Sequence, residues 1–193
     1  MITPNIILES SAGYSICGIE DELFIQRKVF LTGPVTTESV DSLFKQLIHL
    51  EKLDPEKEIT LYINSPGGEV NSGLALYDCI KSIKAPVNTV CIGIAASMGA
   101  IIFLAGKTRY MLENSSIMIH DPSLSSGDMS GMKPNELQKY VDRLNNGKEK
   151  LCRIIAAESK NDYKLIAEIT KEDKYYSADE AINLGFAHKK GGI

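Results

Sequence analysis

A single serine stands among small residues in the segment GIAASMGA (residues 93–100), after the apolar run VNTVCI (87–92). The β-branched run predicts a buried strand and the following AIIFLAG (100–106) predicts the start of a buried helix, so Ser97 lies at a strand-to-helix junction. A helix N-terminus offers unpaired N–H groups, and a serine there can attack a carbonyl carbon while these groups hold the oxyanion. Capping the helix is the commoner role of an isolated serine, and the pattern alone leaves that structural role open.

A nucleophilic serine needs a general base, and the chain contains three histidines. His120 ends the apolar run SIMIH (116–120) and precedes an Asp-Pro pair, so it is expected at a strand end, where α/β domains present catalytic groups. His49 lies in an amphipathic helical pattern, where a role at the surface or at the edge of the core is expected. His188 lies in a tail rich in Lys and Gly, where solvent exposure is expected. The sequence favours His120 as the base, with a purely structural histidine as an equal alternative at this stage.

The base in turn needs a carboxylate that orients its ring and stabilises its charged form. Spacing does not single out one aspartate, because the partner of a catalytic histidine can lie anywhere along the chain. The possible residues are Asp121, Asp128, Asp142, Asp162, Asp173 and Asp179.

A glycine-rich turn could supply part of an oxyanion hole. The segment NSPGGEV (64–70) follows the strand-like run EITLYIN (58–64), and its two glycines can adopt backbone angles that other residues cannot. Such a turn would aim an N–H group into a cleft at the strand ends. An ordinary tight turn is the alternative.

The composition limits the class of protein. With 193 residues, 44% of them hydrophobic, the chain can bury one core and is expected to form a single domain over residues 1–193. A net charge of −4 without a long Lys/Arg cluster argues against nucleic-acid binding. We find no signal peptide, no run of about 18 apolar residues and no CxxC spacing among the four cysteines, so we expect a cytoplasmic protein with reduced thiols and no membrane contact.

Cofactor motifs are missing from the sequence. The segment AGKT (105–108) ends like a phosphate-binding loop, but Ile101 occupies the position of the first glycine that such a loop requires. No cluster of side chains has metal-ligand spacing, so we expect neither a metal nor another cofactor in this chain.

Strand-like and helical segments alternate over the first two thirds of the chain. KVFLTG (28–33) predicts a strand, residues 37–53 predict an amphipathic helix, and a second helix is expected over about 70–84. This βαβ alternation predicts an α/β domain with right-handed crossovers and mostly parallel strand pairing.

The second half is dominated by one long helical segment. Residues 134–159 begin with a proline, which suits the first helical turn, and carry one apolar stripe that is interrupted at Lys148 and weakened by Gly147. A helix of this length predicts an arm that protrudes from the core. The segment SADEAINLG (177–185) predicts a short closing helix, with a capping box at its start and a glycine at its end.

Together these segments resemble the proteolytic subunits of Clp proteases, the ClpP family of serine peptidases. The resemblance runs from about residue 29 to 186 and implies a ClpP/crotonase-like spiral of βαβ units. It also implies an N-terminal axial segment over about 1–27 and a protruding handle helix over about 134–158. Four motifs carry the resemblance: LYINSPGGEV (61–70), GIAASMGA (93–100), SIMIHDP (116–122) and YYSADEAINLGF (175–186).

By position, the resemblance makes Ser97 the nucleophile, His120 the general base and Asp173 the acid that orients the imidazole. The backbone N–H groups of Gly68 and Met98 match the family's oxyanion hole. The implied function is endopeptidase cleavage of unfolded chains inside a chamber of heptameric rings, stacked as a tetradecamer. A partner AAA+ unfoldase would use the ATP, and a second ClpP paralogue is a further possible partner.

This sequence departs from the family at three places. Family members usually carry an acidic residue and then Arg before the catalytic Asp, whereas here Lys171 precedes Glu172, so that the two charges are exchanged. We expect Lys171 and Glu172 to form reciprocal ion pairs between rings, because exchanging both signs preserves a two-fold related pair. The segment 121–134 is longer than usual, and residues 12–24 are acidic where the family has a basic motif. These departures lie in the regions expected to make the contact between rings and to dock the unfoldase.

Three other functions fit parts of the pattern. The order Ser97, Asp173, His188 is that of an α/β-hydrolase esterase, although 193 residues is short for that fold. A non-catalytic or poorly active scaffold subunit of a mixed ClpP ring would keep the same sequence motifs. A crotonase-type acyl-CoA enzyme would use the two oxyanion N–H groups but has no need of the Ser/His/Asp set.

Overall fold

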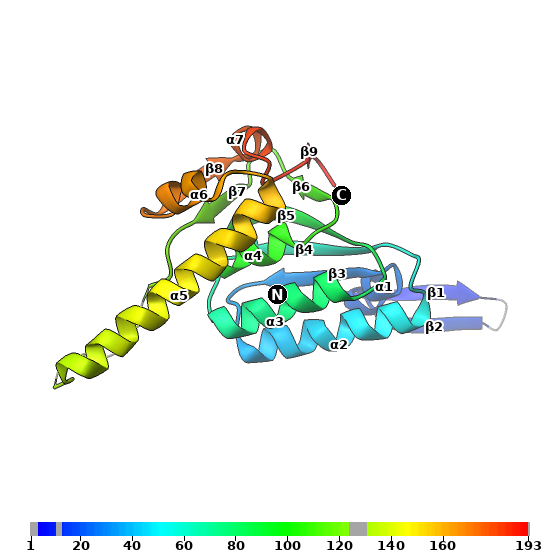
Figure 1. Cartoon of the computed structure of the whole chain (residues 1–193). Coiled ribbons are helices and arrows are strands. Elements are labelled where there is room, and N and C mark those ends of the chain that lie inside the picture. Colours follow the sequence, from blue (N-terminus) through cyan, green and yellow to red (C-terminus); the bar gives the residue numbers. More distant parts are fainter. Residues whose placement is uncertain (1–3, 11–12, 124–130, 193) are drawn as a thin grey trace.

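A computed structural model describes residues 4–10, 13–123 and 131–192 (Figure 1). The core is a largely parallel sheet in the order β3-β4-β5-β6-β9, with β7 paired to β5 and β8 paired to β7. Only the β7–β8 pairing is antiparallel within this described sheet. The predicted α/β class and the mostly parallel pairing are confirmed. The strands are β3 (Lys28–Thr32), β4 (Ile59–Ser65), β5 (Val87–Ala96), β6 (Arg109–Met111), β7 (Ser116–Ile119), β8 (Lys174–Ser177) and β9 (Lys189–Lys190).

Strand β5 forks the sheet. Its first half, Thr89 to Cys91, pairs with β6, and its second half, Ile94 to Ala96, pairs with β7. The strand is longer than the sequence predicted, because it continues through the small residues that follow the β-branched run. As a result β5 ends at Ala96, immediately before the candidate nucleophile.

Helices α2 (Thr37–Leu53) and α3 (Val70–Ser82) lie side by side against the sheet (Figure 1). The bounds of α2 are those predicted, and the Thr36 side chain caps it by accepting a hydrogen bond from the N–H of Ser39. Its predicted apolar stripe is buried except at Phe44, which is 37% exposed. The short helix α4 (Met98–Leu104) follows β5 and is buried along its whole length.

The N-terminal region forms a hairpin that extends away from the core (Figure 1). Strands β1 (Asn5–Ser10) and β2 (Gly13–Gly18) pair antiparallel and lead into α1 (Ile19–Ile25). The sequence reading did not predict these elements. Residues 1–3 and 11–12 of the expected axial segment lie outside the described residues, and its axial placement stays a prediction.

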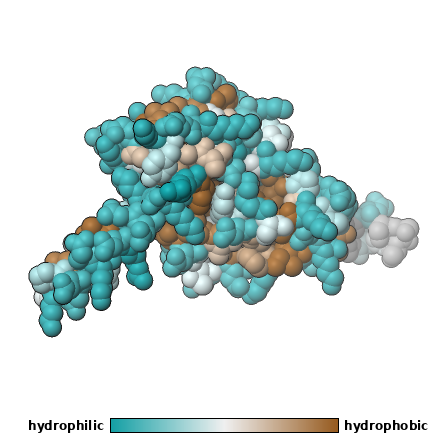
Figure 2. All heavy atoms as spheres, viewed as in Figure 1, coloured by the Kyte–Doolittle hydropathy of each residue, from teal (hydrophilic) through white to brown (hydrophobic). Residues whose placement is uncertain are grey.

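Helix α5 (Pro134–Ser159) is the predicted arm, with the predicted bounds. Its C-terminal half packs on the core through Leu151, Cys152 and Ile155, whereas its N-terminal half projects outward (Figure 1). Figure 2 shows that the projecting half is mainly hydrophilic. Two short helices follow, the unpredicted α6 (Tyr163–Ile169) and the predicted α7 (Ala178–Asn183).

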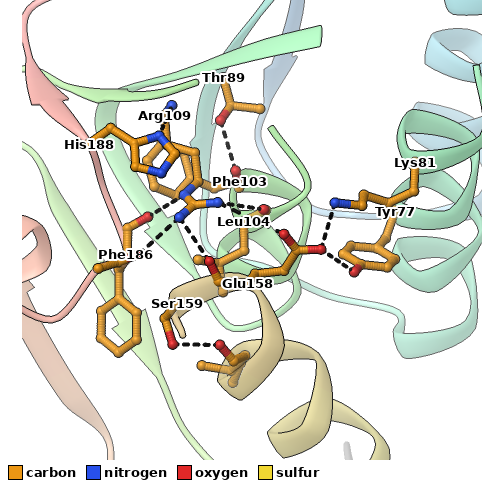
Figure 3. A network of polar contacts seen from close by, with 12 residues as sticks. Tyr77, Lys81, Thr89, Phe103, Leu104, Arg109, Glu158, Ser159, Phe186 and His188 are labelled. Carbon is orange, nitrogen blue, oxygen red and sulfur yellow. Dashed lines mark hydrogen bonds and ion pairs between the residues drawn. The ribbon is translucent and has the colours of Figure 1, made fainter. Parts of the chain in front are cut away.

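A buried arginine fixes the base of α5 to the sheet (Figure 3). Arg109 on β6 is 4% exposed, and its guanidinium donates to the carbonyl oxygens of Leu104, Glu158, Gly185 and Phe186. These carbonyls belong to the end of α4, the end of α5 and the segment after α7. One side chain therefore joins three parts of the chain, and guanidinium donors suit this task because they present a rigid fork.

The carboxylate of Glu158 ties α5 to α3 in the same network (Figure 3). It accepts a hydrogen bond of 2.6 Å from the Tyr77 hydroxyl and pairs with Lys81 at 2.7 Å. Burial and the neighbouring Glu158 raise the pKa of Tyr77, so the phenol stays a donor. The base of α5 is thus held from two sides.

The residue that ends α5 sets up a test of helix termination. Lys160 has φ 59° and ψ 28°, a left-handed conformation in which a side chain costs energy and glycine is preferred. Lys160→Gly should raise the free energy of unfolding by about 0.5 kcal/mol, and Lys160→Val should lower it by about 1 kcal/mol. Urea unfolding followed by circular dichroism measures both.

The matched control is Lys150→Gly, because Lys150 is exposed in the interior of the same helix. Glycine there should lower the stability by about 1 kcal/mol. If glycine has the same sign of effect at both positions, the termination argument is wrong.

Candidate active site

Ser97 makes the whole turn between β5 and α4. Its backbone has φ 52° and ψ −120°, a conformation that is rare for residues other than glycine. The N–H of Ser97 donates to the carbonyl of Met118 on β7 at 2.9 Å, which fixes the turn to the neighbouring strand. The serine hydroxyl makes no capping hydrogen bond to α4, so the capping role left open by the sequence is not the one observed.

The glycine-rich turn after β4 packs directly against this serine. A Cβ atom added at Gly67 would lie 2.6 Å from the Ala96 carbonyl oxygen and 2.7 Å from the Cβ of Ser97. At Gly68 it would lie 2.2 Å from the carbonyl oxygen of Val35. Both positions also have positive φ, 91° and 153°, so both glycines are required by space as well as by conformation.

Two backbone N–H groups stand beside Ser97 without a role in the local secondary structure. The bridge between the Gly68 region and Val35 uses the Gly67 carbonyl and the Glu69 N–H, and leaves the Gly68 N–H outside it. Met98 is the first residue of α4, where an N–H has no acceptor within the helix. Gly68, Ser97 and Met98 line one cavity.

His120 joins Ser97 to Asp173. Its Nε2 lies 2.9 Å from Ser97 Oγ, and its Nδ1 lies 3.0 Å from Asp173 Oδ1. His120 follows β7 directly and Asp173 precedes β8 directly, and the antiparallel pairing of Ile119 with Lys174 places them opposite each other. The chain separation of 53 residues is therefore closed by strand register. The Asp173 side chain is 67% exposed in the single chain.

The other candidate histidines and aspartates lie elsewhere. His49 stacks on Phe24, and His188 accepts a hydrogen bond at Nδ1 from the N–H of Arg109. Burial and the nearby cations of Arg109, Lys160 and Lys189 lower the pKa of His188, which favours this accepting form. Asp128 lies outside the described residues. The remaining aspartates have other partners: Asp121 with Lys148, Asp142 with Gln138, Asp162 with the N–H of Lys164, and Asp179 with Lys190.

The cavity beside the serine has a volume of about 480 Å³ and a mostly apolar wall. The α5 helix contributes two of its buried residues to this wall, so the base of the arm is part of the site. Glu69 supplies a carboxylate and His120 an imidazole. Among the described residues, no group of His, Cys, Asp and Glu is arranged to hold a metal ion. The apolar lining consists mainly of Val70, Met98, Ile101, Met118, Leu151 and Ile155.

A family model described as Clp protease matches residues 11–190. The chain belongs to the Clp protease family. Membership implies peptidase activity, and Clp proteases generally assemble into oligomeric rings. The predicted family and fold are both confirmed. Within residues 4–10, 13–123 and 131–192, none of the helices combines the length and the apolar character needed to cross a membrane.

The expected contact between rings is not visible in one Clp protease chain. The Lys171 ammonium pairs with Glu168 of the same chain at 2.5 Å, and Glu172 is exposed. Lys171 is therefore exposed at the chain surface and already has an ion-pair partner within its own chain. The reciprocal pairing of Lys171 with Glu172 across rings stays a prediction.

An ion pair that the sequence reading missed connects the arm to the residue after His120. Lys148 Nζ on α5 lies 2.5 Å from Asp121 Oδ2, and this hydrogen bond raises the pKa of Lys148. The Asp121 N–H donates to the carbonyl of Thr170 at 2.6 Å. Lys148 thus interrupts the apolar stripe of α5 because it meets a carboxylate. One feature of the sequence could have indicated this pair: the opposite charge of Asp121, which lies next to a candidate catalytic histidine.

Breaking this pair should cost stability. The second carboxylate oxygen, Asp121 Oδ1, is buried and has no partner among the described residues. Lys148→Met leaves the whole carboxylate unpaired, so we expect a loss of about 1–2 kcal/mol at pH 7. Asp121→Asn added to Lys148→Met should recover part of it. Chemical denaturation measures each variant.

Two features make this test specific to the pair. Lys139→Met removes an exposed lysine from the same helix and should change stability by less than about 0.5 kcal/mol. The pKa of Lys148 is raised in the folded chain, so its contribution is complete below the usual lysine pKa near 10.5 and is lost as the pH rises above it. Equal effects of the Lys139 and Lys148 substitutions would contradict the role of the pair.

Proposed function

We propose that this chain is the proteolytic subunit of an ATP-dependent Clp-type protease and that it acts as a serine endopeptidase. The observation that carries the proposal is the continuous contact Ser97–His120–Asp173 at the edge of an apolar cavity in a Clp protease domain. A hydroxyl, an imidazole and a carboxylate in this order are what nucleophilic cleavage of a peptide bond requires.

In this proposal each group has its own step. With the proton of the imidazole on Nδ1, His120 donates a hydrogen bond to Asp173 Oδ1, and Nε2 is free to accept the Ser97 proton. As Ser97 Oγ bonds to the substrate carbonyl carbon, His120 takes that proton and a tetrahedral intermediate forms. His120 then gives the proton to the leaving amine as the C–N bond breaks, which leaves an acyl-enzyme. Water then attacks the ester carbon while His120 takes a proton from it, and a second tetrahedral intermediate forms. As the bond from that carbon to Ser97 Oγ breaks, His120 returns the proton to Oγ, which releases the acid product and restores Ser97.

The oxyanion of each tetrahedral intermediate needs hydrogen-bond donors. The N–H groups of Gly68 and Met98 are the two candidates, because both lie beside Ser97 in the cavity and neither serves the local secondary structure. Donors that are already in place stabilise charge as it develops without reorganisation. The two glycines of the turn allow the Gly68 peptide to approach the serine this closely.

The assembly part of the proposal follows the family. Rings of this chain, stacked as a tetradecamer, would enclose the serines in a chamber that admits unfolded chains only. An AAA+ unfoldase would use ATP to deliver them, and this subunit would need no cofactor. The Asp173 side chain is exposed in the single chain, so a neighbouring subunit would be able to contact it.

The alternatives receive different support. His188 contacts Arg109 and is not part of the cavity wall, which gives an esterase built on Ser97, Asp173 and His188 no support. A non-catalytic scaffold subunit in a mixed ring with a paralogue would show the same contacts in an inactive assembly. Labelling of the assembled protein with a fluorophosphonate probe separates the scaffold from the enzyme.

The first test is removal of the nucleophile. Ser97→Ala should lower kcat/KM on short unstructured peptides by about 10⁴ to 10⁶-fold and abolish probe labelling, because Ser97 is the hydroxyl paired with His120 among the described residues. Ser42→Ala, which changes an exposed serine of α2, should leave labelling and activity unchanged. Activity that survives Ser97→Ala would exclude the proposed mechanism.

The second test concerns the exchanged charges. Glu172→Lys should weaken ring stacking, because it places like charges opposite each other across a two-fold axis. The double exchange of Lys171→Glu with Glu172→Lys should recover part of the stacking. Sedimentation velocity over a range of salt concentrations reports the ring state.

Glu168→Gln is the control for this test, since it removes the partner of Lys171 within the chain and should leave stacking intact. Single exposed ion pairs contribute only about 0–1 kcal/mol, so the effect depends on repetition around the ring. A Glu172→Lys variant that assembles as well as the parent at every salt concentration would rule out the pairing.

A further inference from the structure

Glu69 is the one acidic residue among the described residues that line the cavity containing Ser97. It follows Gly68 directly and forms the N-cap position of α3. Its N–H donates to the carbonyl of Val35 at 2.8 Å, and its carbonyl accepts from the N–H of Gly73 at 2.9 Å. The backbone of Glu69 is therefore held in place at one residue's distance from a candidate oxyanion donor.

The side chain is held as well. Oε2 of Glu69 accepts hydrogen bonds from the hydroxyl of Thr37 at 2.9 Å and from that of Ser72 at 2.7 Å. These two bonds lower the pKa of the Glu69 carboxyl, which is ionised at neutral pH. Both partners are neutral, and no cation pairs with Glu69 among the salt bridges of the described residues. The group is thus an oriented negative charge without a counter-ion.

A substrate in this cavity would meet few charged groups besides Glu69. His120 is the one other titratable side chain in the described cavity wall, and the rest of the wall is mainly apolar. An extended peptide advances about 3.3 Å per residue, and Glu69 lines the same cavity as Ser97. The substrate positions to consider are therefore those within three residues of the scissile bond. An ammonium or guanidinium group brought there would be attracted, and a substrate carboxylate would be repelled.

We propose that Glu69 determines specificity, so that the site prefers extended substrates with Lys or Arg within three residues of the scissile bond and disfavours Asp or Glu there. This inference rests on the proposed peptidase function and adds a charge preference to it. The apolar wall would accept an apolar side chain of the same substrate.

A set of quenched fluorescent peptides tests the proposal. Each peptide shares one apolar centre and carries Lys, Gln or Glu at one of the three positions on either side, and kcat/KM is measured for each at low salt. At the position that faces Glu69, the parent should cleave the Lys peptide roughly three- to tenfold faster than the Glu peptide. Added salt at about 0.5 M should reduce this ratio, because the charges are partly exposed.

Variants then assign the ratio to Glu69. Glu69→Gln keeps the side-chain length and an acceptor for Thr37 and Ser72, and should bring the Lys/Glu ratio close to one. Glu69→Lys should invert it. Glu38→Gln removes the same charge from an exposed residue near the start of α2 that does not line the cavity, and should keep the parent's ratio.

The outcomes separate this inference from the proposed function. If Gln peptides are cleaved by Ser97 but the Lys/Glu ratio is one at all six positions, or if Glu69→Gln keeps the parent's ratio, the role of Glu69 is refuted. If no peptide is cleaved and no probe labels Ser97, the proposed function fails and the inference fails with it. A ratio that Glu38→Gln also abolishes would point to the overall charge of the chain and would likewise overturn the proposal.

Discussion

The turn at Ser97 is the constraint on which the rest of the site depends. Strand β5 ends at Ala96 and helix α4 begins at Met98, so one residue must redirect the chain, and it does so with a positive φ. Strain of this kind persists only where the surroundings hold it. Here the N–H of Ser97 is held by Met118, and its carbonyl accepts from the first turn of α4. The hydroxyl is consequently directed to His120 and not to the end of its own helix.

The fork in β5 gives the sheet two branches with different structural roles. One branch, β7 and β8, lies beside Ser97 and brings His120 and Asp173 together at adjoining strand ends. The other branch, β6 and β9, carries Arg109, whose hydrogen bonds hold the end of α5. Since the base of α5 forms part of the cavity wall, both branches contribute to the site. A long central strand with two successive partners is what makes this possible.

The sequence predicted those features that local pattern controls. Helix periodicity predicted α2 and α5 closely, and strand composition predicted the strand-to-helix junction at Ser97 that the structure shows. The partner of His120 could not be chosen from the sequence alone, because it depends on the β7–β8 register between residues far apart in the chain. The motif resemblance supplied Asp173, and the contact with His120 agrees with it. Short strands such as β6 and β9 carry too few residues for a periodic signal. From the sequence alone, Lys148 only interrupts the apolar stripe of α5, because its partner Asp121 lies in another segment.

Glu158 and Glu69 show that the compensation of a carboxylate in this chain depends on its burial. Glu158 is 14% exposed, and the Tyr77 hydroxyl and the Lys81 ammonium compensate it, as a buried carboxylate requires. Glu69 is exposed, so water can solvate its charge while two hydroxyls merely orient it. A peptide that fills the cavity would displace part of that water and weaken the solvation of the carboxylate. The charge then needs compensation from the substrate itself, because none of the salt bridges among the described residues pairs a cation with it. A substrate that brings a positive charge to Glu69 would therefore fill this cavity at a lower electrostatic cost than one that brings a carboxylate.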